Sequence, residues 1–298
     1  MLTLQAPAKV NLTLEVLHRR PDGFHEIRSV IQTINLCDSL RFRLSRKLRF
    51  SCDNPDLVIE ESLVSRAAAL LQEASGFLKG ATIEISKRIP LTSGLGGDSS
   101  DAAAILRGLN KLWQLGLSFQ ELLELAPRLG SDVAFFLYGG TALVEGRGER
   151  VTPLPPLPQR WVVLLVPPVP RMREKTRHLY ASLKPKHYTQ GRFTDRLVGR
   201  LTGGGGVTSS MLFNVFEEVA LDNFSQLGEY RGQFLKAGAS SVHLAGSGPA
   251  LFTLVKDKAG AEKIYENLQK QSAECYLTET SAAIEETERA ADKKGGIK

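Results

Sequence analysis

The clearest pattern of hydrophobic and polar positions lies near the start of the chain, where residues 8–17 alternate strictly. Apolar residues recur at every second position from Val10 to Val16, whereas Lys9 and Asn11 fall on the opposite, polar side. Because successive strand side chains face opposite ways, this alternation predicts a half-buried strand. Arg20-Pro21-Asp22-Gly23 then predicts a turn, after which the chain returns as a second strand.

The rest of the chain divides into further strands and helices. Short apolar or alternating runs predict strands at residues 27–34, 40–50, 81–86, 141–144, 150–152, 161–166, 240–245, 249–255 and 273–280. Helical spacing predicts helices at residues 63–75, 99–115, 172–183, 192–201, 211–220, 223–237 and 258–271, and also after Ser118 and Asp132. Ser118 with Glu121 forms a capping box, which strengthens one of these helix starts.

A proline-rich stretch at residues 153–158 interrupts both helix and sheet, so we place a domain boundary there. The predicted domains cover residues 1–155 and 160–284, and the charged residues 285–298 are expected to form a disordered tail. In the second domain, the order of elements predicts an antiparallel sheet with helices on one face. The predicted fold class is therefore α+β.

A glycine-rich segment from Pro90 to Asp101 joins a predicted strand to a predicted helix. A glycine turn lets backbone N–H groups approach an anion closely, and the helix start adds unpaired donors and a positive dipole end. A plain glycine loop is the alternative interpretation. Ser99, Ser100 and Asp101 at the helix start favour a phosphate and its metal ion, so the segment predicts a phosphate-binding loop.

Two common nucleotide motifs do not fit this loop. A Walker A loop needs a lysine followed by serine or threonine, and the loop contains no lysine. The dinucleotide fingerprint Gly-x-Gly-x-x-Gly/Ala would require a glycine or alanine at position 99 after Gly94 and Gly96. Ser99 occupies that position, and Asp98 precedes it. The dinucleotide interpretation is therefore weak.

Composition narrows the class of protein further. The chain has 298 residues and is 42% hydrophobic, which is typical of a globular protein. Its formal net charge of +6 is typical of an ordinary mildly basic surface or, alternatively, of a protein that attracts anionic small molecules. No basic block with interleaved aromatics occurs, so we expect no nucleic-acid partner. The longest apolar run, residues 161–166, is too short to span a bilayer, and we expect no membrane association.

Cysteines, histidines and the first residues of the chain bear on its location. Cys37, Cys52 and Cys275 lack CxxC spacing, and the histidines lack metal-ligand spacing, so we expect reduced thiols and no protein-bound metal site. The first residues lack the pattern of a signal peptide. These features together predict a cytoplasmic protein.

The loop also resembles a family motif. Residues 90–100 match Pro-x-x-x-Gly-Leu-Gly-x-x-Ser-Ser, the second motif of the GHMP small-molecule kinases. Further matches to one branch of that family follow in the family's order, at residues 6–12, 19–26, 129–133, 139–142 and 245–252. The resemblance implies a two-domain GHMP kinase fold, with an N-terminal ribosomal-protein-S5-like ATP domain and a C-terminal ferredoxin-like domain.

The resemblance also implies an activity and its catalytic groups. The chain is expected to phosphorylate a hydroxyl of a small molecule, cytidine diphosphate methylerythritol, with ATP accompanied by Mg²⁺, and to be a monomer or homodimer. Asp132 would accept the hydroxyl proton, and Lys9 would balance charge on the transferring group. ATP would be bound by Pro90, Leu91, Thr92, Ser93, Gly94, Leu95, Gly96, Gly97, Asp98, Ser99 and Ser100.

By the same resemblance, a second group of residues would bind the substrate. Asn11 could hydrogen-bond it, Phe24 would stack on the cytosine where tyrosine is more familiar, and His25 would bind the cytosine edge. Thr176 and Tyr180 lie four residues apart on a predicted helix and suit closure over the base or ribose. An ordinary exposed helix face is the alternative for this last pair.

One position departs from the family, and two other functions stay open. Asp98 stands where the family carries a small residue, and a carboxylate about 4 Å from a phosphate would cost roughly 1–4 kcal/mol. We favour an outward-pointing side chain over a bridging Mg²⁺. The open alternatives are a GHMP kinase for another alcohol, such as mevalonate or homoserine, and a non-catalytic nucleotide-binding paralogue. The retained Lys9 and Asp132 argue against the paralogue, and the Asp22–His25 turn argues against the other alcohols.

Overall fold

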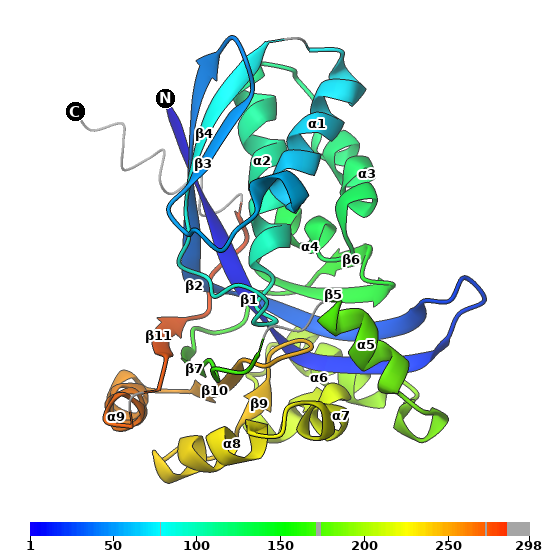
Figure 1. Cartoon of the computed structure of the whole chain (residues 1–298). Coiled ribbons are helices and arrows are strands. Elements are labelled where there is room, and N and C mark those ends of the chain that lie inside the picture. Colours follow the sequence, from blue (N-terminus) through cyan, green and yellow to red (C-terminus); the bar gives the residue numbers. More distant parts are fainter. Residues whose placement is uncertain (78, 171–173, 272, 285–298) are drawn as a thin grey trace.

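The computed structural model describes residues 1–77, 79–170, 174–271 and 273–284 and contains two β-sheets with helices packed against them (Figure 1). The larger sheet comprises β1 (Leu2–Arg19), β2 (His25–Ser45), β3 (Arg49–Cys52), β4 (Gly80–Ser86), β5 (Thr141–Gly146), β6 (Arg150–Pro153) and β8 (Phe213–Asn214). The smaller sheet comprises β7 (Trp161–Leu165), β9 (His243–Leu244), β10 (Leu251–Val255) and β11 (Cys275–Glu279).

Helices connect and cover these strands. The α-helices are α1 (Leu63–Ser75), α2 (Gly97–Trp113), α3 (Phe119–Leu129), α4 (Val133–Tyr138), α5 (Lys175–Ser182), α6 (Arg192–Thr202), α7 (Phe216–Asn223), α8 (Leu227–Lys236) and α9 (Lys258–Gln269). Short 3₁₀ turns are η1 (Ile59–Glu61), η2 (Pro185–His187) and η3 (Ser209–Met211). None of the helices in the described ranges is long and apolar enough to cross a membrane.

The long strands β1 and β2 form the centre of the larger sheet. The sheet has the order β3-β4-β2-β1-β8, and β5 pairs with the first part of β2. The sequence predicted separate strands at residues 27–34 and 40–50, but β2 runs without a break from His25 to Ser45. It is continuous because its first part pairs with β5 while its last part pairs with β4, so hydrogen-bonded neighbours support most of its length.

Helices α1 to α4 gather on one side of this sheet and form a hydrophobic core with it (Figure 1). Helix α2 lies closest, because small residues face the strands. At Gly108, an added Cβ would lie only 2.4 Å from the Phe42 ring of β2. This close contact fixes the axis of α2 and therefore the position of its N-terminus at the phosphate loop.

Both faces of β1 are buried from Ala6 to Val16, which corrects the half-buried strand expected from its alternation. Its apolar residues Val10 and Leu12 share a core with Val162 and Leu164 of β7. Its polar face is covered by α6, where the backbone N–H of Thr194 donates to Glu15 at 2.7 Å and its hydroxyl donates to Thr13 at 2.9 Å. The polar residues in the middle of β1, from Lys9 to Glu15, are thus enclosed within the protein.

The smaller sheet has the order β11-β7-β10-β9 with antiparallel pairs throughout, as the sequence predicted for the second half. The predicted helix at residues 211–220 is wrong, because this stretch contains the end of η3, then β8 and then the start of α7. Asn214 interrupts the helix by donating to the carbonyls of Leu244 and Gly246, both at 2.8 Å, while β8 pairs in parallel with β1.

The predicted domain boundary falls between β6, which belongs to the larger sheet, and β7, which belongs to the smaller one. However, β8 lies in the second half of the chain and joins the first sheet. The division into residues 1–155 and 160–284 therefore stays a prediction. The predicted tail at 285–298 and the start of the helix predicted at 172–183 lie outside the described residues.

Candidate active site

The phosphate loop connects β4 to α2, and its glycines are required by close backbone contacts. Gly94 has φ +90°, and an added Cβ would lie 2.1 Å from the carbonyl oxygen of Ala245. Gly96 has φ +78°, and its Cβ would lie 2.7 Å from the Phe136 ring. Side chains at either position would strain the backbone and collide with their neighbours. The loop therefore packs tightly against its neighbours. Because Gly94 and Gly96 have no side chains, the backbone N–H groups of the loop form the candidate anion-binding surface.

Hydrogen bonds attach this loop to two other segments. The backbone N–H of Lys9 donates to the Leu95 carbonyl at 3.0 Å, and that of Ala250 donates to the Ser93 carbonyl at 3.0 Å. Helix α2 begins directly after Gly96, which supplies no side-chain cap. The first N–H groups of α2 and its positive dipole end are thus available to a phosphate.

Lys9 and Asp132 come together beside the loop. The Lys9 ammonium lies 3.7 Å from a carboxylate oxygen of Asp132 and donates to Asn11 at 2.7 Å. Asp132 precedes α4, but its side chain makes no capping hydrogen bond, so the carboxylate is free to face Lys9. Lys9 is 4% exposed, whereas the Asp132 side chain is 33% exposed. The pair thus combines a fixed buried cation with an accessible carboxylate.

Asn11 is held in place by the protein itself. Its amide oxygen accepts from Lys9, and its amide nitrogen donates to the Ser29 hydroxyl at 2.9 Å. Ser29 in turn donates to the Thr13 carbonyl at 2.5 Å. This chain of hydrogen bonds positions the Lys9 ammonium, a role that the sequence analysis did not assign to Asn11.

His25 and Tyr180 meet at the other side of the site. Their rings stack with centroids 5.2 Å apart, and the Tyr188 hydroxyl lies 3.5 Å from Nε2 of His25. Burial, and secondarily the charge of Arg19, lowers the pKa of His25, so the ring is neutral near pH 7. Burial raises the pKa of Tyr180, helped by the charge of Asp132. The sequence offered no motif that would have singled out Tyr188.

Phe24 lies on the outside of this cluster. The residue is 52% exposed, and the Arg147 guanidinium sits 4.7 Å from the ring centroid. An exposed aromatic ring of this size is available to stack against a flat ligand. The base-binding role that the resemblance implies for Phe24 stays a prediction.

Helix α5 connects the site to the segment at residues 245–250. The Thr176 hydroxyl lies 3.1 Å from that of Ser247. The preceding residue, Lys175, donates to the carbonyl oxygens of Thr92, at 2.7 Å, and Gly248. The predicted residues Thr176 and Tyr180 therefore both reach the site, and Lys175 is a neighbour that the sequence analysis missed because no motif contained it.

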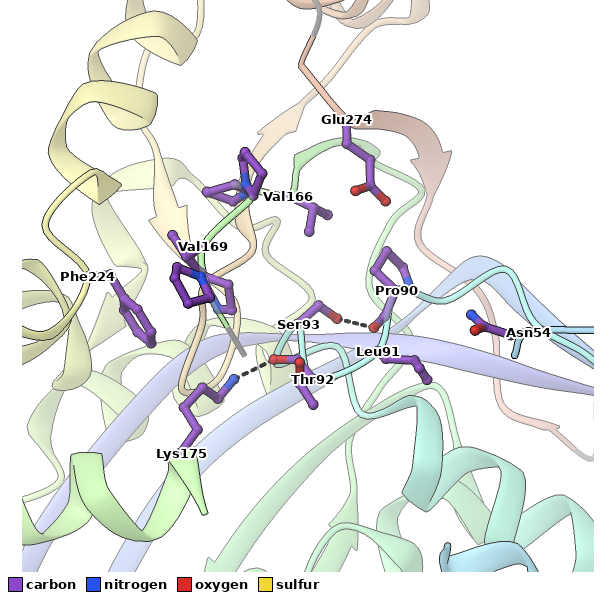
Figure 2. A pocket seen from close by; sticks show the side chains of 14 residues that line it. Asn54, Pro90, Leu91, Thr92, Ser93, Val166, Val169, Lys175, Phe224 and Glu274 are labelled. Carbon is purple, nitrogen blue, oxygen red and sulfur yellow. Dashed lines mark hydrogen bonds between the residues drawn. The ribbon is translucent and has the colours of Figure 1, made fainter. Parts of the chain in front are cut away.

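A cavity of about 310 Å³ opens beside the loop (Figure 2). Its walls come from the loop, the start of α5, and segments that follow β3, β7 and α7 or precede β10 and β11. They comprise Asn54, Pro90–Ser93, Val166–Pro170, Lys175, Phe224, Pro249 and Glu274. A cavity of this size, whose wall combines apolar side chains with polar groups such as Ser93 and Lys175, suits part of a nucleotide. Together with the glycine loop and the free N-terminus of α2, it fits the ATP that the resemblance implies.

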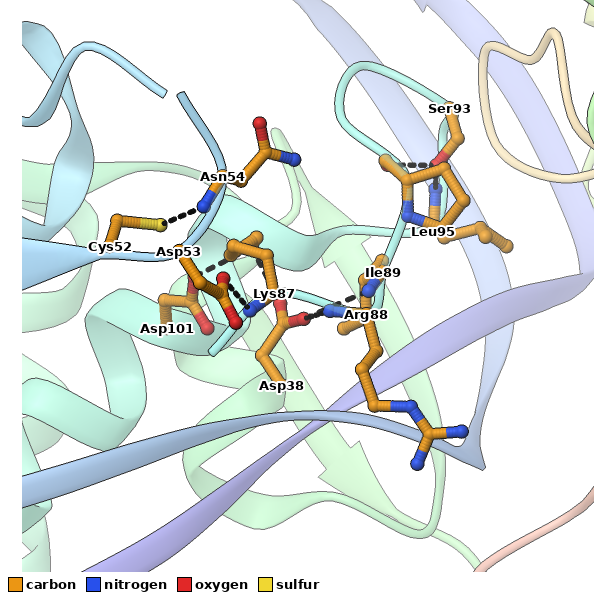
Figure 3. A network of polar contacts seen from close by, with 11 residues as sticks. Asp38, Cys52, Asp53, Asn54, Lys87, Arg88, Ile89, Ser93, Leu95 and Asp101 are labelled. Carbon is orange, nitrogen blue, oxygen red and sulfur yellow. Dashed lines mark hydrogen bonds and ion pairs between the residues drawn. The ribbon is translucent and has the colours of Figure 1, made fainter. Parts of the chain in front are cut away.

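A second lysine–carboxylate group lies at the base of the loop (Figure 3). The Lys87 ammonium contacts Asp38 at 2.5 Å and Asp101 at 2.7 Å, with all three side chains almost wholly buried. Asp38 also accepts from the backbone N–H groups of Arg88 and Ile89. Burial raises the pKa of Asp101 to about 8. This network holds together both ends of the loop, where β4 ends and α2 begins.

Comparison with known proteins agrees with this geometry. Residues 62–140 match the family model "GHMP kinases N terminal domain", and residues 199–274 match "GHMP kinases C terminal". A homoserine kinase from Cytophaga hutchinsonii shares the fold, with a TM-score of 0.69 at 20% identity over 94% of each chain. The fold and the site thus define a GHMP kinase.

Similar proteins of known name show to which group of GHMP kinases the chain belongs. The 4-diphosphocytidyl-2-C-methyl-D-erythritol kinase of Dehalococcoides mccartyi strain BAV1 is 52% identical over 96% of this chain and 100% of that protein. The kinase of the same name from Geobacillus thermodenitrificans is 40% identical over 90% and 93%. A crystal structure of 4-(cytidine 5'-diphospho)-2C-methyl-D-erythritol kinase has a TM-score of 0.80 at 33% identity, covering 94% of this chain and all of that one. The chain belongs to the 4-diphosphocytidyl-2-C-methyl-D-erythritol kinases. The resemblance and the α+β fold class predicted from the order of elements are confirmed.

Proposed function

We propose that the chain transfers the γ-phosphoryl group of ATP to the 2-hydroxyl of 4-diphosphocytidyl-2-C-methyl-D-erythritol, in the non-mevalonate route to isoprenoid precursors. The observation that supports it most directly is the Lys9–Asp132 pair, 3.7 Å apart beside the phosphate loop, in a chain 52% identical to a kinase of that name. The relatives favour this substrate over mevalonate or homoserine. Both catalytic groups are retained, which argues against a non-catalytic paralogue.

The pair suits the chemistry of phosphoryl transfer. The transition state is loose and its charge is spread over oxygens, so the enzyme mainly positions groups and stabilises charge. In our proposal Asp132, the more exposed partner, accepts the proton of the attacking hydroxyl. Lys9 is buried and fixed by Asn11, so its charge is already oriented toward the group in transfer.

The aromatic cluster supplies a candidate site for the cytidine end of the substrate. Because His25 is neutral near pH 7, one ring nitrogen can donate and the other accept at the edge of a base. Phe24 offers its exposed ring for stacking. Thr176 and Tyr180 border the same region from α5, so closure over the base or ribose remains part of the proposal.

In the proposal, ATP occupies the loop and the adjoining cavity, and a Mg²⁺ ion bound with ATP would supply positive charge to the phosphate oxygens. Ser99, in the first turn of α2, would offer an oxygen ligand to the metal ion at that end of the loop. Asp98 is exposed, which favours the outward orientation expected from the sequence. We further propose that the enzyme is cytoplasmic and either a monomer or a homodimer.

The decisive experiment is ADP release from ATP with 4-diphosphocytidyl-2-C-methyl-D-erythritol, mevalonate or homoserine offered separately. We expect turnover with the cytidyl compound alone, and almost none in the Asp132→Asn variant. Turnover of mevalonate or homoserine, or none of any compound, would overturn the proposal.

A further inference from the structure

Lys175 is a buried cation at the phosphate loop to which the proposed reaction assigns no role. It is the first residue of α5 and is 9% exposed. Its ammonium donates to the carbonyl oxygen of Thr92, in the loop (Figure 2), and to that of Gly248. Three segments distant in the sequence therefore meet at one ammonium group, on the wall of the 310 Å³ cavity.

The surroundings of this ammonium lack a counter-charge. Among the described residues, no carboxylate lies within 4.0 Å of Nζ, and its acceptors are neutral carbonyls. The other titratable residue of the cavity wall, Glu274, is exposed and accepts from the Tyr276 hydroxyl. On α5 itself, Glu174 is paired with Arg177.

The electrostatic environment disfavours the charged form of this lysine. Burial, and secondarily repulsion from Lys9 of β1, lowers the pKa of Lys175 to about 8. A buried lysine without an anion is costly, because desolvation of the ammonium is not repaid by an opposite charge. A bound anion would remove that cost.

We propose that Lys175 is a nucleotide-binding residue whose ammonium pairs with a phosphate oxygen of ATP held by the loop. The loop and the N-terminus of α2 place an anion site next to Thr92, to which Lys175 is already bonded. Binding of ATP would thus tie α5 and residues 245–250 to the phosphates. This inference rests on the proposed function only for the identity of the anion.

Formation of this ion pair should be coupled to the uptake of a proton by Lys175. Near pH 8, about half of the free enzyme has Lys175 uncharged, and a phosphate beside it raises the pKa again. ATP binding should therefore take up about half a proton at pH 8, and affinity should fall as pH rises through that value. Below pH 7 the lysine is already charged, and the uptake should vanish.

The test is calorimetry of ATP binding to the full chain, without acceptor substrate, from pH 7 to 9.5 in buffers of different ionisation enthalpy. Wild-type affinity should fall roughly tenfold between pH 7 and pH 9, the loss expected for a group with a pKa near 8. Lys175→Met should bind ATP on the order of tenfold more weakly at pH 7 and lose the proton uptake at pH 8.

Two further variants make the result decisive. Lys175→Arg keeps a cation at every pH tested, so its affinity should no longer fall between pH 7 and pH 9. The pH dependence of ATP affinity in Lys175→Arg therefore tests the role of Lys175 even if Lys175→Met does not fold. Lys236→Met removes an exposed lysine at the end of α8 and should bind like the wild type.

The inference fails if Lys175→Met binds ATP within twofold of the wild type with the same proton uptake. It also fails if Lys175→Arg retains the wild-type dependence on pH. Absence of ATP binding by the wild type would overturn the proposed kinase function as well, whereas normal binding without turnover would overturn that function alone. The two failures are therefore distinguishable.

Discussion

The loop lies between two lysine–carboxylate groups that differ in packing and in purpose. At one side, Lys9 and Asp132 are 3.7 Å apart, and the carboxylate is one-third exposed. At the base, Lys87 contacts Asp38 and Asp101 at 2.5 and 2.7 Å, out of reach of water. The same residue types thus form an open pair and a closed network around one loop.

The difference in exposure distinguishes a pair suited to catalysis from a network that stabilises the structure. A carboxylate that accepts a proton from a substrate must be reachable, and Asp132 is, because it makes no capping bond to α4. The closed network exposes nothing to a ligand, and its hydrogen bonds fix the end of β4 and the N-terminal part of α2 relative to each other. We expect changes in the open pair to affect rate and changes in the closed network to affect stability.

The largest effect is expected from Asp132→Asn. Loss of the proton acceptor should lower kcat by about 10²- to 10⁴-fold, since general bases contribute that much. The melting temperature and the KM for ATP should change little, because the side chain is one-third exposed and makes no capping bond. Steady-state kinetics with thermal melting measures both. Asp222→Asn, on the exposed side of α7, is the matched control. A large loss of stability with kcat retained would reverse the roles given to the two groups.

Lys87→Met tests the closed network. Removing the cation leaves two buried carboxyl groups without their partner, which typically costs about 3–5 kcal/mol. Urea unfolding should show this loss, while Lys263→Met on the exposed face of α9 should be nearly neutral. If Lys87→Met unfolds like the wild type, the network does not stabilise the loop.

The motifs predicted much of this site but not the network. The sequence singled out the glycine loop from its own residues, and the family resemblance added Lys9 and Asp132, because each lies in a short contiguous motif. Asp38, Lys87 and Asp101 were missed as a group because they lie 49 and 14 residues apart and meet only through the packing of β2, β4 and α2. Local propensity also failed at residues 211–220, where pairing of β8 with β1 overrode a helical pattern.

A milder effect, dependent on pH, is expected from Asp101→Asn. Burial raises the pKa of Asp101 to about 8, so the folded protein binds a proton there that the unfolded chain has released above about pH 4. The stability that this group contributes is present at acidic pH and is lost as pH rises toward 8. Asparagine resembles the protonated acid, so the variant should gain at least about 1 kcal/mol relative to the wild type between pH 5 and pH 8. Urea unfolding at both values measures the difference, and a constant difference would mean that Asp101 stays ionised throughout.

The smallest effect is expected from Asp98→Asn. This variant tests whether the Asp98 carboxylate contributes to ATP binding at the open side of the loop or to the closed network. Asp98 is exposed in the first turn of α2, where a negative charge favours the helix by about 0.3–1 kcal/mol. Its negative charge also raises the pKa of Asp101 slightly, by less than burial and the charge of Asp38 do. With the side chain pointing outward, the KM for ATP should change less than about twofold, because the exposed charge is screened by water and salt. A clear rise in this KM together with a higher requirement for Mg²⁺ would instead place Asp98 at the metal ion, and the open side of the loop would then extend to the start of α2.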